Sequence, residues 1–172
     1  LDRAILQTEP TYLDRVQEYA RILLQRNQLL KKQVDEEELA PWTEGLIRSG
    51  SRIRYERQLY LERFKPFLCQ VYREISGDKE SAGLNYSVEK KSQEELKDHL
   101  AAALEKLASR ERKFGVSLAG PHRDDLDFLV EERSLRAFGS QGQQRSFLLA
   151  FKAAQVMDLE KQHQEPPVLL LD

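Results

Sequence analysis

The sequence predicts a mixed fold of the α+β or α/β class, with a mostly helical part followed by a smaller part that contains strands. In residues 1–113, apolar side chains recur at three- and four-residue spacing, which is typical of amphipathic helices. From Phe114 onward, the pattern changes to short alternating segments. The chain ends in the aliphatic run 168–171, which predicts a strand buried on both faces of a parallel sheet. We therefore expect two domains, residues 1–113 and residues 114–172.

Composition limits the class of protein. With 172 residues, 40% of them hydrophobic and 33% charged, the chain can bury a core. A net charge of −2 gives no general attraction to nucleic acid, so any DNA contact has to come from a local basic patch. The single Cys69 excludes an internal disulfide and a cysteine-based zinc site. No apolar run approaches the ~20 residues of a membrane span, and no signal peptide opens the chain, so we expect a cytoplasmic protein.

Two long helices open the chain. Apolar spacing predicts one over residues 10–34 and a second over about 42–75, which Pro66 is expected to kink or break. The short acidic link between them favours an antiparallel hairpin, the arm of the molecule. Asn27 interrupts the apolar stripe of the first helix; it either fixes the register between paired helices or bonds a neighbouring loop.

The second helix carries more cations than anions. Phosphate binding needs such a cluster, which makes a duplex-DNA contact through Arg48, Arg52 and Arg57 one interpretation. The alternative is a solvated face held by salt bridges.

A short strand and a third helix follow. Alternation predicts the strand at 84–88. Ser92 and Glu95 have the spacing of a capping box and open a helix with a leucine spine. The spine consists of Leu96, Leu100, Leu104 and Leu107.

The region after Phe114 is expected to form three strands, at 115–118, 125–130 and 134–138, with a hairpin loop at 131–133. The polar turn before the second strand holds His122, Arg123 and Asp124. No nucleophile neighbours these three side chains, so they form either a structural salt-bridge turn or a contact to DNA or nucleotide.

A phosphate site is predicted where the last helix begins. Backbone N–H groups at a helix N-terminus have no intrahelical partner, and the helix dipole favours an anion there. Ser140 adds a hydroxyl, and Gly142 lets a ligand approach the backbone. Apolar residues cover more than one face of this helix, which predicts burial between layers. Asp172 follows the terminal strand, where strand-based nucleotide hydrolases place a carboxylate for Mg²⁺.

Together, the motif SQGQQRS at 140–146 and the run PVLLLD at 167–172 resemble the signature motif and Walker B strand of ABC-type ATPases of the SMC-like group. Three further segments fit this resemblance: GPHRDDL at 120–126, QRNQLLK at 25–31 and WTE at 42–44. The resemblance implies a helical arm joined to the signature-motif lobe of an ATPase head.

The resemblance implies an ATP-dependent DNA-binding protein that acts in recombinational repair and replication-fork maintenance. Two copies would sandwich ATP, with Ser140, Gln141, Gly142 and Gln143 contacting the γ-phosphate of ATP held by the other copy. Asp172 would hold Mg²⁺ and act in catalysis. The implied partners are DNA, as a duplex or a single-strand/double-strand junction, a second copy, and mediator proteins of recombinational repair.

Both ends are expected to be internal to a longer protein, because Leu1 is not a methionine and Asp172 follows directly on a strand. The 172 residues contain no P-loop, so this piece alone is expected to be inactive. Two alternatives stay open: a non-catalytic helical module that binds other proteins, and a different SMC-like ATPase.

Overall fold

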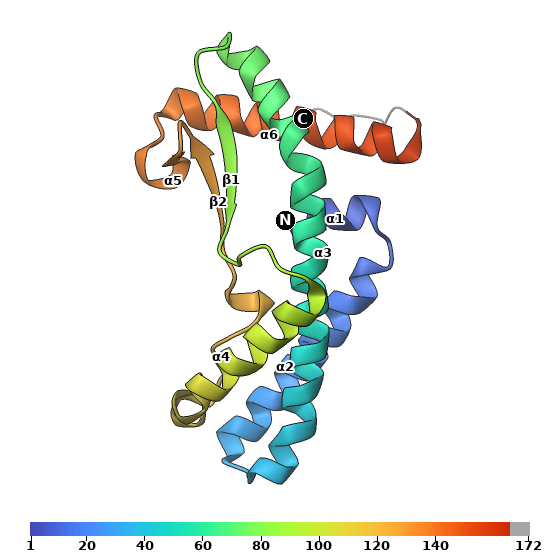
Figure 1. Ribbon diagram of the computed structural model, residues 1–172, viewed down its shortest axis with the longest axis vertical. Coiled ribbons are helices and arrows are strands. Elements are labelled where there is room, and N and C mark those ends of the chain that lie inside the picture. Colours follow the sequence, from blue (N-terminus) through green and yellow to red (C-terminus); the bar gives the residue numbers. More distant parts are fainter. Residues whose placement is uncertain (166–172) are drawn as a thin grey trace. The chain divides into compact units, whose positions relative to one another are not determined.

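The computed structural model describes residues 1–165 (Figure 1). The predicted terminal strand and Asp172 lie outside the described residues. The chain forms two compact units and the long helix α3 (Glu36–Ser76) contributes to both. Unit 1 comprises Leu1–Glu9, Leu59–Ser87 and Asp125–Asp172, and unit 2 comprises Pro10–Gln58 and Val88–Asp124. The expected domain boundary after residue 113 is a different division of the chain, and it stays a prediction.

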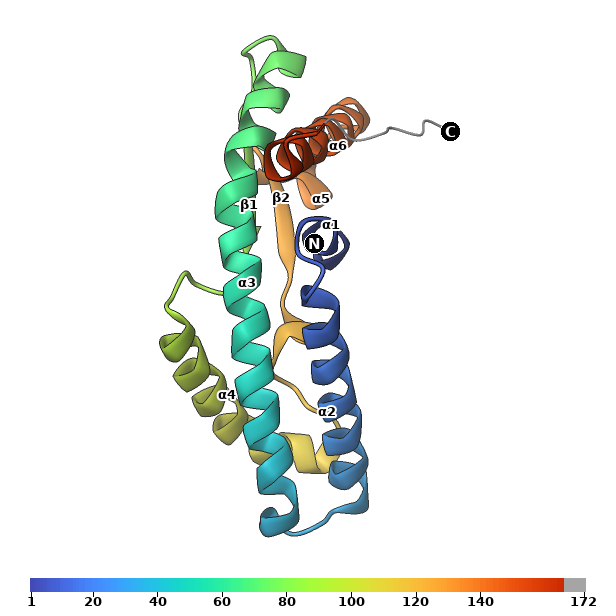
Figure 2. The same cartoon turned by 90° about the vertical axis from the view of Figure 1, so that its right-hand side faces the viewer.

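Unit 2 is built on the predicted helical hairpin. Helix α2 (Tyr12–Lys32) runs beside the first part of α3 in the opposite direction (Figure 2). Helix α4 (Gln93–Phe114) packs across them through its leucines, of which Leu96 and Leu100 are fully buried. A Cβ at Gly50 would lie 3.0 Å from the Leu100 side chain and 3.2 Å from that of Tyr19. Glycine at this position of α3 therefore allows the close approach of its neighbours.

The long helix α3 continues through both of its prolines. Asp35 accepts a hydrogen bond from the Glu38 N–H at 2.9 Å, and acidic side chains fill the first turn, where the helix dipole favours them. Of the kink or break predicted at Pro66, the break is wrong, because the helix runs on to Ser76. The Pro66 ring is exposed, so it does not disturb the buried side of the helix.

The loop after α4 corrects the prediction of a strand at 115–118. The capping box of Ser92 and Glu95 is confirmed at the start of α4, and Gly115 ends the helix with φ of +65°. Beyond it, the Ser117 N–H donates to the Asn27 side chain and the Leu118 N–H to the Glu111 carboxylate. Side-chain oxygens thus accept the backbone N–H groups that would pair with a neighbouring strand in a sheet. Of the two alternatives for Asn27, the bond to a neighbouring loop is the one formed.

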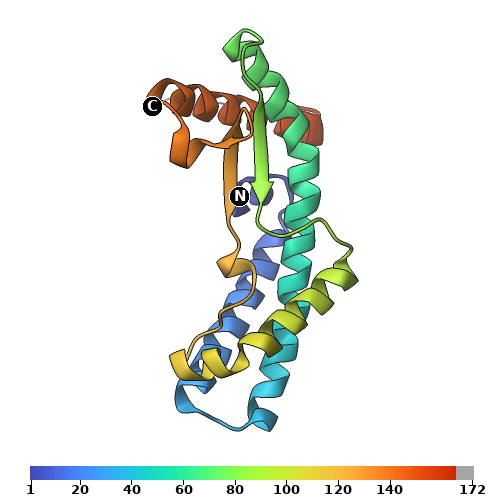
Figure 3. The ribbon, with the colours of Figure 1, turned by 60° about the vertical axis from the view of Figure 1, so that its left-hand side comes forward.

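Unit 1 contains a small antiparallel sheet of order β1-β2-β3. Strands β1 (Ala82–Tyr86) and β2 (Leu126–Val130) lie side by side, seen as the green and orange arrows in Figure 3, with Leu84 opposite Phe128. A turn at Glu131 and Glu132, both with positive φ, leads into β3 (Arg133–Ser134), so the hairpin forms where the sequence predicts it.

The chain after β3 differs from the prediction. Residues Leu135–Phe138 form the short helix α5 rather than the expected strand at 134–138, and the Gly139 N–H bonds the Leu135 carbonyl. A Cβ at Gly139 would overlap that carbonyl oxygen, so the tight turn depends on glycine. The seven-residue helix α1 (Asp2–Thr8), which the apolar pattern did not predict, contacts the last helix, α6 (Gln141–His163).

Aromatic side chains form the core of unit 1. Phe147 and Phe151 of α6 both contact Phe128 of β2, with ring centroids 5.1 and 5.5 Å apart. On the other side, Phe147 meets Tyr72 and Phe151 meets Phe64, both of α3. The predicted burial of α6 between layers is therefore correct for the face that carries Phe147 and Phe151. It is wrong for Leu148 and Leu149, which are 60% and 62% exposed.

Among the described residues, none of the helices combines the length and apolar character that a membrane span requires.

Candidate nucleotide-contacting site

Ser140 and Gln143 fix the start of α6 through a capping box. The Ser140 hydroxyl oxygen accepts the Gln143 N–H at 3.1 Å, and the Gln143 side-chain oxygen accepts the Ser140 N–H at 2.9 Å. Each residue thus satisfies a backbone donor of the other. The helix therefore begins at a defined residue and presents its first turn in one orientation.

The open side of this turn suits an oxyanion. Ser140, Gln141 and Gly142 are exposed. A Cβ at Gly142 would meet only the Ser140 hydroxyl, at 3.8 Å, so packing within the described residues does not require glycine here. The Ser140 hydroxyl can still donate its own proton, and the first N–H groups of a helix have no intrahelical acceptor. An anion that approaches this face meets several donors at the positive end of the α6 dipole.

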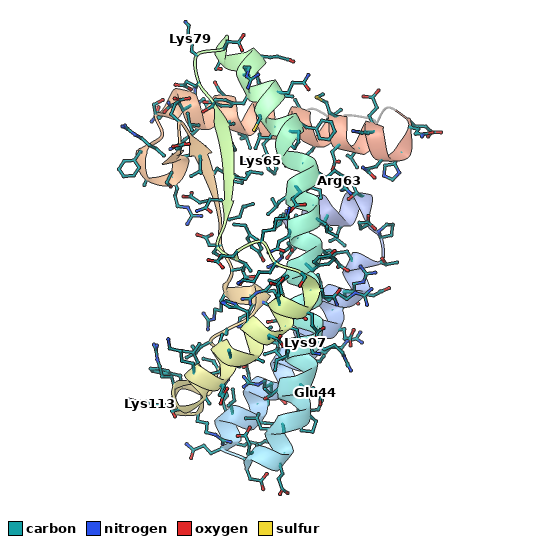
Figure 4. All side chains as sticks on the ribbon, in the orientation of Figure 1. Glu44, Arg63, Lys65, Lys79, Lys97 and Lys113 are labelled. Atoms are coloured by element: carbon teal, nitrogen blue, oxygen red, sulfur yellow. The ribbon has the colours of Figure 1, made fainter. Side chains whose placement is uncertain are left out.

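A second set of contacts ties the turn to α3. The Gln143 side-chain N–H donates to one Glu80 carboxylate oxygen at 2.8 Å, and the Tyr72 hydroxyl donates to the other at 2.7 Å. Glu80 lies in the loop between α3 and β1, whose tip is marked by Lys79 in Figure 4. Sequence reasoning missed both Glu80 and Tyr72, because 63 residues separate Glu80 from Gln143 and no local pattern links them.

Beside the turn lies a cleft of about 380 Å³. Gly139 and Gln143 form one side, Arg133 adds a positive charge, and Phe138 is 75% exposed. The cleft is lined by Val130, Glu131, Arg133, Ser134, Leu135, Phe138, Gly139 and Gln143.

In unit 2, the three arginines expected to contact DNA differ in their surroundings. The Arg48 side chain is 74% exposed and lies 4.0 Å from Glu18. Arg52 is 52% exposed and bonds Glu56, one turn along α3. Arg57 is 11% exposed, and its guanidinium donates to the Pro121 carbonyl at 2.8 Å. Arg48 and Arg52 therefore present charge to solvent, whereas Arg57 holds the polar turn.

The turn before β2 is a salt-bridge turn at Asp124. The Arg54 guanidinium binds both Asp124 oxygens, at 2.6 and 2.9 Å, and both side chains are almost fully buried. This bidentate geometry is the strong form of an ion pair. A Cβ at Gly120 would overlap the Tyr19 hydroxyl, and φ of +135° also requires glycine there.

His122 completes this turn. Its Nδ1 lies 2.6 Å from the Tyr19 hydroxyl, and its Nε2 lies 3.1 Å from the Ser117 carbonyl. A carbonyl only accepts, so Nε2 carries the proton and Nδ1 accepts from Tyr19. Removal of water from around the ring lowers the pKa of His122, which favours this neutral form, and burial raises the pKa of Tyr19. His122 and Arg123 are both exposed, so a contact to DNA or nucleotide stays a prediction for these two side chains.

The predicted magnesium ligand, Asp172, lies outside the described residues. Within residues 1–165, no group of three or more His, Cys, Asp or Glu side chains could hold a metal ion.

Comparison with known proteins matches the whole chain to one family. It is 49% identical over 172 residues to the DNA replication and repair protein RecF of Syntrophotalea carbinolica, and 43% identical over 176 residues to that of Geobacter metallireducens. Both matches cover 100% of this chain. Over its whole length, the chain is similar to these RecF proteins. No family model matches the sequence.

The solved structures of RecF share this fold. The structure of the recombination mediator protein RecF-ATP in the RecFOR pathway matches with a TM-score of 0.93 and 32% identity over 99% of this chain. The RecF-ATPrS structure matches with a TM-score of 0.90 and 30% identity. The chain spans about half of these RecF proteins, 47% of the Syntrophotalea protein and 48% of the RecF-ATP chain.

Proposed function

We propose that this chain is the arm and signature-motif part of an ATP-dependent DNA-binding protein that acts in recombinational repair and replication-fork maintenance. The observation that carries the proposal is the capped, open start of α6 at residues 140–143. It supplies donors for an oxyanion in a chain whose fold matches RecF-ATP.

In this proposal, the first turn of α6 acts on nucleotide held by a second copy of the protein. Ser140 donates its hydroxyl proton and the N–H groups around Gly142 donate along the helix axis, toward the γ-phosphate. Gln141 and Gln143 flank Gly142 and would also contact the nucleotide. Such donors act by position and charge, because phosphoryl transfer needs little covalent help from the protein. Bound Mg²⁺ would neutralise phosphate charge, and Asp172 is the residue that would hold it.

The proposed partners are DNA, a second copy bound through ATP, and RecR-like and RecO-like mediator proteins. The similarity to RecF-ATP of the RecFOR pathway supports the mediators. A cytoplasmic location remains part of the proposal.

The 172-residue chain alone is expected to bind Mg-ATP weakly and to release no phosphate. It contains no P-loop, whose amides and lysine supply most contacts to a triphosphate. Calorimetric titration with Mg-ATP, beside the full-length protein, measures this difference. Tight binding by the chain alone would contradict the proposal, and a full-length protein that also fails to bind ATP would favour the non-catalytic interaction module.

Changing Arg48 and Arg52 together to alanine in the full-length protein is expected to weaken duplex-DNA binding at every sequence. The dependence of log K on log salt should become shallower by about one unit per lost phosphate contact, so by about two. Arg57→Ala is the matched control on the same helix, because its guanidinium already binds the Pro121 carbonyl. An unchanged slope for the double variant would assign Arg48 and Arg52 to a solvated face.

A further inference from the structure

We propose that Glu80 is a positioning residue for the signature turn, in that its carboxylate sets the orientation of Gln143 and, through Gln143, the start of α6. This inference rests on the proposed function, because it assigns to Glu80 a part in ATP-dependent dimerisation. The juxtaposition that carries it is the chain of hydrogen bonds from Tyr72 to Glu80 to Gln143 to the Ser140 backbone.

The end of α3 brings Glu80 into place. Gly77 and Asp78 both have positive φ, and the Asp78 N–H bonds the Arg73 carbonyl, as in a Schellman motif. The chain reverses there, and the Ser76 hydroxyl bonds both the N–H and the carbonyl of Glu80. The Glu80 carboxylate therefore lies against the end of α3 rather than extending into solvent.

Both oxygens of this carboxylate have a donor, and each donor is fixed. The Tyr72 side chain is fully buried and packs on Phe147 of α6. Burial raises the pKa of Tyr72, so its hydroxyl keeps the proton that it donates to Glu80. The second oxygen receives the N–H of the Gln143 amide at 2.8 Å.

Glu80 decides which way the Gln143 amide faces. An amide has one end that donates and one that accepts, whereas a carboxylate only accepts. With its nitrogen bound to Glu80, the amide points its oxygen at the Ser140 N–H. If the amide turned over, it would place a donor against a donor at Ser140. The carboxylate therefore holds the capping box in the one orientation that completes it.

The test compares the ATP-dependent dimerisation of full-length variants. Sedimentation with Mg-ATP over a range of protein concentrations measures it. Glu80→Ala is expected to raise the concentration needed for dimerisation about tenfold for each signature turn, the size expected for losing charge-assisted hydrogen bonds. A dimer that uses two such turns would weaken about a hundredfold. ATP binding by the monomer should stay within about twofold, because the P-loop makes those contacts.

Glu80→Gln is the variant that separates positioning from general stability. Its amide can accept from Gln143 and donate to the Tyr72 oxygen, so dimerisation should return to within about threefold of the parent. Glu74→Ala is the matched control, since it removes an exposed carboxylate from the same end of α3, where Glu74 pairs with Gln70.

Three results would overturn the assignment of Glu80: dimerisation of Glu80→Ala at the parent concentration, no recovery in Glu80→Gln, or an equal loss in Glu74→Ala. A parent protein that does not dimerise with ATP would instead overturn the proposed function itself.

Discussion

Replacing Ser140 with arginine in the full-length protein is expected to abolish ATP-dependent dimerisation and phosphate release. The side chain of Ser140 caps α6 and lies on the exposed face of its first turn. Arginine there would remove the cap, which is worth ~1 kcal/mol, and would fill the space in which we place the γ-phosphate of the other copy. Monomer ATP binding should stay nearly intact. Sedimentation with and without Mg-ATP, beside a phosphate-release assay, measures both effects.

Ser140→Thr and Asp172→Asn are the comparison variants. Threonine keeps a hydroxyl and is a good N-cap, so Ser140→Thr should retain most dimerisation. Asp172→Asn should dimerise but release phosphate slowly, because it removes the charge proposed to hold Mg²⁺. If Ser140→Arg dimerised and hydrolysed ATP like the parent, Ser140 would be a helix cap and nothing more.

Changing Glu111 to alanine is expected to lower the free energy of unfolding by about 3 to 5 kcal/mol, because it leaves the Arg26 charge buried and unpaired. Arg26 is 3% exposed, Glu111 is fully buried, and their ion pair measures 2.8 Å. The Glu111 carboxylate also accepts the Leu118 N–H at 2.6 Å. Urea unfolding of the 172-residue chain gives the value directly.

Lys97→Ala is the control for this measurement. Lys97 lies on the same helix, α4. Its Nζ lies 3.0 Å from a Glu94 carboxylate oxygen, and both side chains are exposed. Exposed pairs of this kind are screened by solvent and contribute little, so the control should change the stability little. A loss below about 1 kcal/mol for Glu111→Ala would show that the Arg26 charge finds water or another partner.

Local signals in the sequence predicted the parts of the fold that local physics decides. The capping box at Ser92 needs only residues three positions apart, and it formed as expected. The box at Ser140 has the same spacing, but we did not predict it from the sequence. The hairpin turn at 131–132 also depends on adjacent residues. The strands expected at 115–118 and 134–138 failed for the opposite reason. Their backbone partners come from distant side chains or from a tight turn, which alternation of apolar residues does not report.

The site shows the same division. A motif of adjacent residues marks Ser140 and Gly142 as candidates for the phosphate contact, and their role stays a prediction. The sequence contains no sign of Glu80, and its pattern groups Arg57 with two exposed arginines although Arg57 bonds the Pro121 carbonyl. A sequence shows which charged residues share a helix face. It does not show which distant residue pairs with each charge, because the fold brings that residue into contact.

The central claim is that the start of α6 acts on nucleotide held by the other copy, and mixing two inactive variants tests it most directly. One carries Ser140→Arg, and the other carries alanine in place of the P-loop lysine that we expect in the full-length protein. A mixed dimer has one site in which both halves are intact and one in which both are damaged. We predict that the mixture recovers ATP-dependent association and phosphate release, to at most about half the parent rate per dimer, since one of two sites is whole. A mixture as inactive as each variant alone would contradict action in trans.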